Sequence, residues 1–317
     1  MTNFFRKMST AFLSAAMLAL VFAGCSNPSG SGGSGTGTTT NGLIDMVWVP
    51  AGSFQMGSPS TEPGRDTDET QHKVTLTTGF YMGKYEVTQA QYQAVVGINP
   101  SNFTTPEPPE TSTAQRPVEQ VSWYDSLVFC NLLSMQEGLS PAYRISGSTD
   151  PALWGNVPTS QDDTWNAVVI VDGSTGYRLP TEAQWEYACR AGTTSAFNWG
   201  TDTINSTQAN YNATYTDANN LTSGTNLQRT TSVGSYAANA WGLYDMHGNV
   251  REWCWDYYDN YLTWAQTDPM GPVSGVNHVR RGGSYPNMGW EIRSASRNNY
   301  GNPYMRSNNY GFRVVRP

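Results

Sequence analysis

Positive charge is scarce in this sequence. Its 317 residues include 18 Lys and Arg against 25 Asp and Glu, which gives a formal net charge of −7. No run of Lys and Arg is available to neutralise a row of phosphates, so we expect no nucleic-acid partner. Only 14% of the residues are charged and 12% are aromatic, a composition that argues against a disordered chain.

Cysteine and histidine are also few. The chain has four Cys and three His, and no Cys follows Cys254. Cys130, Cys189 and Cys254 stand in apolar or aromatic surroundings, so we expect unpaired, buried thiols that pack as small hydrophobic groups. The three histidines are widely spaced, and we interpret each as structural. A G-x-S-x-G nucleophile elbow is missing, although a Ser/His/Asp nucleophile built from distant residues stays open.

Long apolar runs are limited to one, from Ala11 to Phe22, which is too short for an ordinary membrane span. Arg6-Lys7 precede this run, and a basic pair followed by a short apolar run predicts a signal peptide over residues 1–24. The ending VFAGC resembles a bacterial lipobox, which predicts lipidation of Cys25 and anchoring to the membrane at the outer membrane or cell surface. A simple cleavable signal with an incidental cysteine is the alternative.

The remaining chain divides into a tether and a folded domain. Residues 25–42 carry the lipidated Cys and a Gly/Ser/Thr-rich stretch, which behaves as a flexible spacer because it has little to bury. The folded domain spans residues 43–317. Within it, Thr88, Ser122 and Thr181 each precede a helical pattern and are followed three residues on by an acceptor, so each predicts a capped helix N-terminus. Segments 46–58, 72–76 and 80–82 predict strands.

Residues 281–313 have an unusual composition. They read RGGSYPNMGWEIRSASRNNYGNPYMRSNNYGFR, with clusters of Asn, Tyr and Ser between single arginines and glycines. Asn and Ser favour turns, so we expect Asn298-Asn299 and Asn308-Asn309 on exposed loops. Tyr supplies large contact area at a small entropic cost, as in antibody paratopes. The composition fits a binding surface; an ordinary polar loop before a last strand is the alternative.

Three phrases carry a resemblance to a known family. MVWVPAGSFQMGS at 46–58, GYRLPTEAQWEYACRAG at 176–192 and WGLYDMHGNVREWCWDYY at 241–258 are similar, in this order, to the formylglycine-generating-enzyme (sulfatase-modifying factor) family. The resemblance covers residues 43–317. It implies a single α+β domain of the C-type-lectin fold, rich in loops and with few regular elements.

The same resemblance bears on chemistry. Enzymes of this family oxidise a substrate cysteine with two active-site cysteines, the first two residues after the GGSY phrase and the second five residues further on. Here Pro286-Asn287 follows Tyr285 and no cysteine comes later. Without these thiolates we expect no copper and no enzymatic activity. An oxidase-like enzyme that modifies exported proteins is the alternative, and it rests on fold analogy.

Calcium is the cofactor that the resemblance implies, in a structural role. The family binds it through the positions that correspond to the side chains of Asp245 and Glu252 and the carbonyls of Gly248 and Val250. Calcium prefers hard oxygen ligands, which a turn with carboxylates at its ends can present. A helix N-terminus capped by Asp245 is the alternative.

Residues 281–313 also resemble the variable region of the treponemal variable proteins, which are diversified by retroelements through adenine mutagenesis of AAC-type codons. Such codons can yield Asn, Tyr, Ser, Gly or Pro, but never Met, Trp, Glu or Lys. The resemblance implies a monomer that binds an unidentified protein or glycan through a diversified surface. The implied ligand-binding positions are Tyr285, Pro286, Asn287, Gly289, Ser296, Asn298, Asn299, Tyr300, Asn302, Tyr304, Ser307, Asn308 and Asn309.

Overall fold

The computed structural model describes residues 38–39, 42–298 and 301–317. The predicted signal peptide, Cys25, most of the tether, and Asn299 and Tyr300 lie outside the described residues. Among the residues described, no helix is both long and apolar enough to cross a bilayer.

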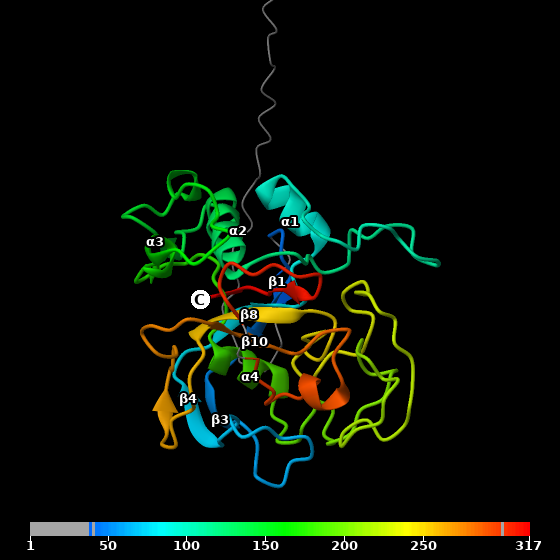
Figure 1. Cartoon of the computed structure of the whole chain (residues 1–317). Coiled ribbons are helices and arrows are strands. Elements are labelled where there is room, and N and C mark those ends of the chain that lie inside the picture. The colour runs from blue at the N-terminus through cyan, green and yellow to red at the C-terminus, as the bar shows by residue number, and fades with distance from the viewer. Residues whose placement is uncertain (1–37, 40–41, 299–300) are drawn as a thin grey trace, which may run out of the picture. The chain divides into compact units, whose positions relative to one another are not determined.

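Short strands form four sheets in the described part of the chain (Figure 1). The four-stranded sheet has the order β1-β2-β5-β12, from Thr38–Thr39, Met46–Val49, Phe80–Gly83 and Val315–Arg316. A second sheet has β8 (Arg251–Tyr257) between antiparallel β10 (His278–Arg281) and parallel β11 (Tyr310–Gly311). The third joins β3 (Gly52–Met56), β4 (His72–Leu76) and β9 (Gln266–Thr267), and the smallest pairs β6 (Tyr143–Arg144) with β7 (Val169–Ile170). The three predicted strand segments are confirmed.

The predicted helix starts are confirmed as well. Helices α1 (Gln89–Val96), α2 (Trp123–Gln136) and α4 (Glu182–Arg190) begin directly after Thr88, Ser122 and Thr181, and each forms the full reciprocal capping box. A short α3 (Asp163–Asn166) and the 3-10 turns η1 (Pro151–Leu153) and η2 (Gly289–Ile292) complete the set. Helix α4 ends at Ala191, which adopts a left-handed backbone conformation with φ of 44°.

Helices cover the central strand β8 from two sides. In Figure 1, α1 and α2 lie on one side of β8 and β10, and α4 lies on the other. The indole of Trp123 on α2 donates to the Cys254 carbonyl at 2.9 Å, and that of Trp253 donates to the Val121 carbonyl at 3.0 Å. On α4, Trp185 and Cys189 are fully buried in a second core.

Two long segments have little regular structure. Residues 191–250 contain neither helix nor strand, and η2 is the only regular element between β10 and β11, within the residues described there. A turn at Gly282-Gly283 reverses the chain after β10. Both glycines have positive φ, and a Cβ at Gly283 would collide with the Ile292 side chain. The chain then loops back until Tyr310–Gly311 pairs with Arg251–Glu252 of β8.

Candidate ligand-binding surface

The C-terminal segment, defined as residues 281–313, is attached to the domain by ion pairs of its arginines. Five of them, Arg281, Arg293, Arg297, Arg306 and Arg313, contact a carboxylate that lies outside the segment. Arg281, Arg293 and Arg313 have no exposed side-chain surface. A buried charge is costly unless it is paired and hydrogen-bonded, so each pair strongly favours one placement of the backbone beside it.

Helix α4 receives two of these arginines. Arg297 makes a two-point contact with Glu182, at 2.7 Å from Nε to Oε1 and 2.9 Å from Nη2 to Oε2. Arg281 contacts Glu186 and also donates to the carbonyls of Ala295 at 2.8 Å and Ser296. Burial opposes ionisation of Glu182, but Arg297 and Arg281 outweigh burial and lower its pKa. Arg281, at the start of the segment, is thereby bonded both to Ala295 and Ser296 in the middle of the segment and to helix α4.

The other three arginines reach different parts of the domain. Arg293 contacts Glu62 at 2.6 Å and Glu69 at 2.6 Å, both in the turn region between β3 and β4. Arg306 contacts Asp125 at the start of α2, with distances of 2.7 and 2.9 Å. Arg313 contacts Glu252 of β8 through two hydrogen bonds of 2.6 Å. The segment is therefore held along its length, and Glu291 adds a further ion pair with Arg251 of β8 at 3.1 Å.

The predicted ligand-binding positions differ in exposure. Pro286 is exposed, and seven more are half-buried: Asn287, Asn298, Asn302, Tyr304, Ser307, Asn308 and Asn309. Tyr285, Gly289 and Ser296 are buried, so their expected place on a contact surface is wrong. Tyr285 packs edge-on against Phe103, the Gly289 amide donates to Asp217 at 2.9 Å, and the Ser296 carbonyl accepts from Arg281.

The asparagines are less free than their composition suggests. Asn287 donates to Glu291 at 2.6 Å, Asn298 accepts from Arg280, and Asn309 donates to Ser284 at 3.0 Å. The expected exposure of Asn298 and Asn308-Asn309 is wrong in degree, because all three residues are half-buried. Asn308 differs from the others, because no hydrogen bond engages its side chain among the residues described. Pro286, Asn302, Tyr304 and Asn308 are the least constrained of the set.

A hollow of about 640 Å³ lies beside Arg306 of the C-terminal segment. Its lining includes Arg306, Asp125, Ser101, Asn102 and Gln120. The Asn102 and Phe103 amides donate to the buried carboxylate of Glu119 at 2.9 and 2.8 Å. Burial raises the pKa of Glu119 to about 7. Glu119 could not be predicted from the sequence, because its partners lie 16 and 17 positions away in an irregular loop.

The positions of the two family cysteines hold groups without thiol chemistry. Asn287 stands at the first and Ile292, which is fully buried, at the second. Cys130, Cys189 and Cys254 are unpaired and buried, as predicted. Cys189 lies 3.7 Å from Nε2 of His247, but burial raises the pKa of its thiol to about 12 and lowers that of His247 to about 4. This contact is a packed core contact and not an activated nucleophile.

The four predicted calcium positions do not fit the ion as they stand. Both oxygens of Glu252 accept hydrogen bonds from Arg313, and Oε2 also accepts from the Trp185 indole. Asp245 accepts from the Gly234 amide at 2.7 Å and keeps one buried oxygen without a partner. Calcium takes six to eight oxygens, and the described residues contain no cluster of three or more His, Cys, Asp or Glu that could hold a metal. Calcium binding stays a prediction.

The turn from Asp245 to β8 is organised by a carboxylate that the sequence did not reveal. Glu86 accepts from the Asn249 side chain at 2.6 Å and from the Val250 amide at 3.1 Å. Gly248 approaches the Asn210 carbonyl so closely that a side chain would collide with it. The alternative of a helix capped by Asp245 is wrong, because the residues after it lead directly into β8.

Comparisons with known proteins agree with this architecture. The model of the sulfatase-modifying factor enzyme 1-like domain matches residues 35–317. The chain belongs to this family. It is 36% identical to chaperone protein LppX of Paenibacillus barcinonensis, over 76% of this chain and 82% of that protein. It is 30% identical to the formylglycine-generating enzyme of Mus musculus, over 86% of this chain and 75% of that enzyme.

Solved structures extend the comparison. Treponema denticola variable protein 1 superposes with a TM-score of 0.75 at 31% identity, covering 89% of this chain and 99% of that one. PvdO from Pseudomonas aeruginosa superposes with a TM-score of 0.64 at 26% identity, covering 89% of this chain and 98% of that one. The predicted α+β fold of the C-type-lectin type, as in formylglycine-generating enzymes, is confirmed, and so is the predicted similarity to a treponemal variable protein.

Proposed function

We propose that this protein is a lipid-anchored surface protein that binds a protein or glycan through the C-terminal segment and has no oxidase activity. The observation that carries the proposal is the arrangement of this segment. Its arginines are paired with carboxylates elsewhere in the domain, whereas Pro286 is exposed and Asn302, Tyr304 and Asn308 are half-buried between the pairs. Similarity to Treponema denticola variable protein 1 supports the same interpretation.

The surface chemistry suits an adaptable ligand site. Tyr304 partly packs on the α1–α2 core, so its ring is held while one side stays accessible. Asn302 and Asn308 are half-buried and carry amide groups that can donate and accept hydrogen bonds. Rigid aromatic rings combined with adaptable amides are the pattern that paratopes use.

Diversification predicts a particular distribution of differences among sibling genes. We expect substitutions at Pro286, Asn302, Tyr304 and Asn308, and constant arginines at the ion pairs, because loss of a buried pair destabilises the fold. Sequencing the gene from sibling isolates, together with its flanking DNA, checks this. A nearby reverse transcriptase and an AAC-rich near-repeat of the segment are expected. Identical sequences in all isolates and no repeat would contradict diversification.

Absence of oxidase activity is directly testable. The copper-loaded protein, incubated with a cysteine-bearing sulfatase peptide and oxygen, is expected to form no aldehyde, since Asn287 and Ile292 offer no thiolate to a copper ion. Mass spectrometry of the peptide measures the product, and a formylglycine-generating enzyme assayed in parallel is the positive control. An aldehyde produced by this protein would favour the enzymatic alternative.

The lipid anchor predicts a separation of location from folding. Cys25→Ala is expected to move the protein from the detergent phase to the aqueous phase without changing its melting temperature, because two or more acyl chains give stable anchoring and the tether lies outside the core. Detergent-phase partitioning and thermal melts measure the two effects, with Ser26→Ala as the matched control. Unchanged partitioning of Cys25→Ala would exclude the anchor.

A further inference from the structure

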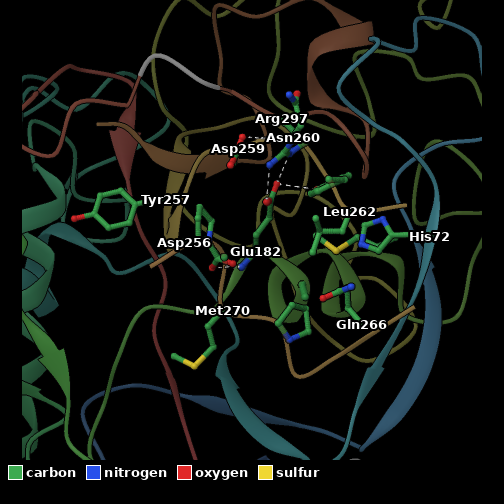
Figure 2. A pocket seen from close by; sticks show the side chains of 16 residues that line it. His72, Glu182, Asp256, Tyr257, Asp259, Asn260, Leu262, Gln266, Met270 and Arg297 are labelled. Atoms are coloured by element: carbon green, nitrogen blue, oxygen red, sulfur yellow. Dashed lines mark hydrogen bonds and ion pairs between the residues drawn. The ribbon is translucent and has the colours of Figure 1, made fainter. Parts of the chain in front are cut away.

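A second pocket of about 320 Å³ lies apart from the predicted ligand-binding positions (Figure 2). It is bounded by the start of α4, the end of β8 and the loop that follows β8, and none of the thirteen implied positions lines it. Met56, Leu262, Pro269, Met270 and Pro272 supply apolar walls. The volume and the walls suit the apolar body of a small molecule.

Most of the charge in this pocket is already balanced. Figure 2 shows Glu182 and Asp256 side by side, with Arg297 above them. Glu182 is paired with Arg297 and also accepts from the Tyr261 hydroxyl at 2.9 Å. The Arg297 guanidinium lies 3.8 Å from the Tyr261 ring centroid, so one of its faces is covered too. The Glu182–Arg297 pair therefore leaves no free charge for a ligand.

Asp256 is the group without a counter-ion. Its side chain is 4% exposed, and its Oδ2 accepts from the Glu182 amide at 2.7 Å. Among the residues described, no Lys, Arg or His forms an ion pair with it or with Asp259 at the rim. His72 directs Nδ1 to the Thr70 carbonyl at 3.0 Å. The unmatched groups of the pocket are thus acidic, and an incoming cation would complete the pairing of Asp256.

We propose that this pocket binds a small organic cation, whose apolar body contacts Met56, Leu262 and Met270 and whose ammonium group pairs with Asp256. An anion is disfavoured, because it would meet Asp256 and Asp259, and the Arg297 guanidinium that lines the pocket is already paired with Glu182. A neutral molecule of the same shape would gain the apolar contacts but leave Asp256 without a partner. The binding is noncovalent and does not depend on the function proposed for the C-terminal segment.

Cation binding should depend on pH. Burial, and then the charge of Glu182, raise the pKa of Asp256 to about 8, so at pH 7 the cation must displace a proton. The charged or titratable groups around Asp256 are Glu182, Arg297, Arg178, Cys254, Asp259, His72, His278, Tyr257 and Tyr261. Because the ionised form of Asp256 increases as the pH rises through its pKa, affinity should increase about tenfold between pH 7 and pH 9.

Calorimetry with cyclohexylammonium and with cyclohexanol tests the proposal. An alkylammonium stays charged at both pH values. We expect the amine to bind more tightly than the alcohol at pH 9, with an affinity about tenfold higher at pH 9 than at pH 7, and the alcohol to show no pH dependence. Equal affinities for amine and alcohol, amine binding independent of pH, or no amine binding at either pH would overturn the proposal.

Two matched variants locate the cation. Asp256→Asn keeps an acceptor for the Glu182 amide but cannot ionise, so amine affinity at pH 9 should fall about tenfold or more and lose its pH dependence. Asp259→Asn removes an exposed charge and should change the affinity by less than about threefold. A larger loss in Asp259→Asn than in Asp256→Asn would overturn the assignment. If Asp256→Asn does not fold, the pH dependence of the unmodified protein decides.

Discussion

The arrangement of the C-terminal segment depends on buried arginine–carboxylate pairs. A segment rich in Asn, Ser and Gly forms little helix or strand, and beyond Arg281 its only described strand is the two-residue β11, so a backbone ladder holds little of it. Arg281, Arg293 and Arg313 replace that ladder with guanidinium groups that are inaccessible to solvent and contact Glu186, Glu62 with Glu69, and Glu252. The planar guanidinium donates in fixed directions, and an unpaired buried charge is costly. Each pair therefore strongly favours one backbone path.

This arrangement separates the residues that hold the segment from those available for contact. Arg293 and Arg297 bond inward to carboxylates that belong to the turn after β3 and to α4. Asn302, Tyr304 and Asn308 lie between anchors and are half-exposed. Substitutions at those positions leave the ion pairs intact. A catalytic centre of the family type would need reactive groups at Asn287 and Ile292, and these positions carry an amide bonded to Glu291 and a core side chain.

Local features could be predicted from the sequence, whereas long-range pairs could not. The capping boxes at Thr88, Ser122 and Thr181 join residues three positions apart, so sequence spacing is sufficient to predict them. The burial of Tyr285 depends on Phe103, and the place of Ser296 depends on Arg281 reaching back across the segment. Arginines between apolar residues indicate that acids must face them, but sequence position does not identify Glu62 and Glu69 as those acids. The expected calcium ligand Glu252 is similarly engaged by Arg313, a partner 61 positions away.

The most direct test of the account compares one anchoring residue with one surface residue of the same segment. Chemical denaturation would measure the free energy of unfolding of Arg293→Met and Asn308→Ala. We expect Arg293→Met to lose about 3–5 kcal/mol, because Glu62 and Glu69 would stay buried without a partner. Asn308→Ala should change the free energy of unfolding by less than about 0.5 kcal/mol. Similar losses in the two variants would contradict the separation of anchors from surface.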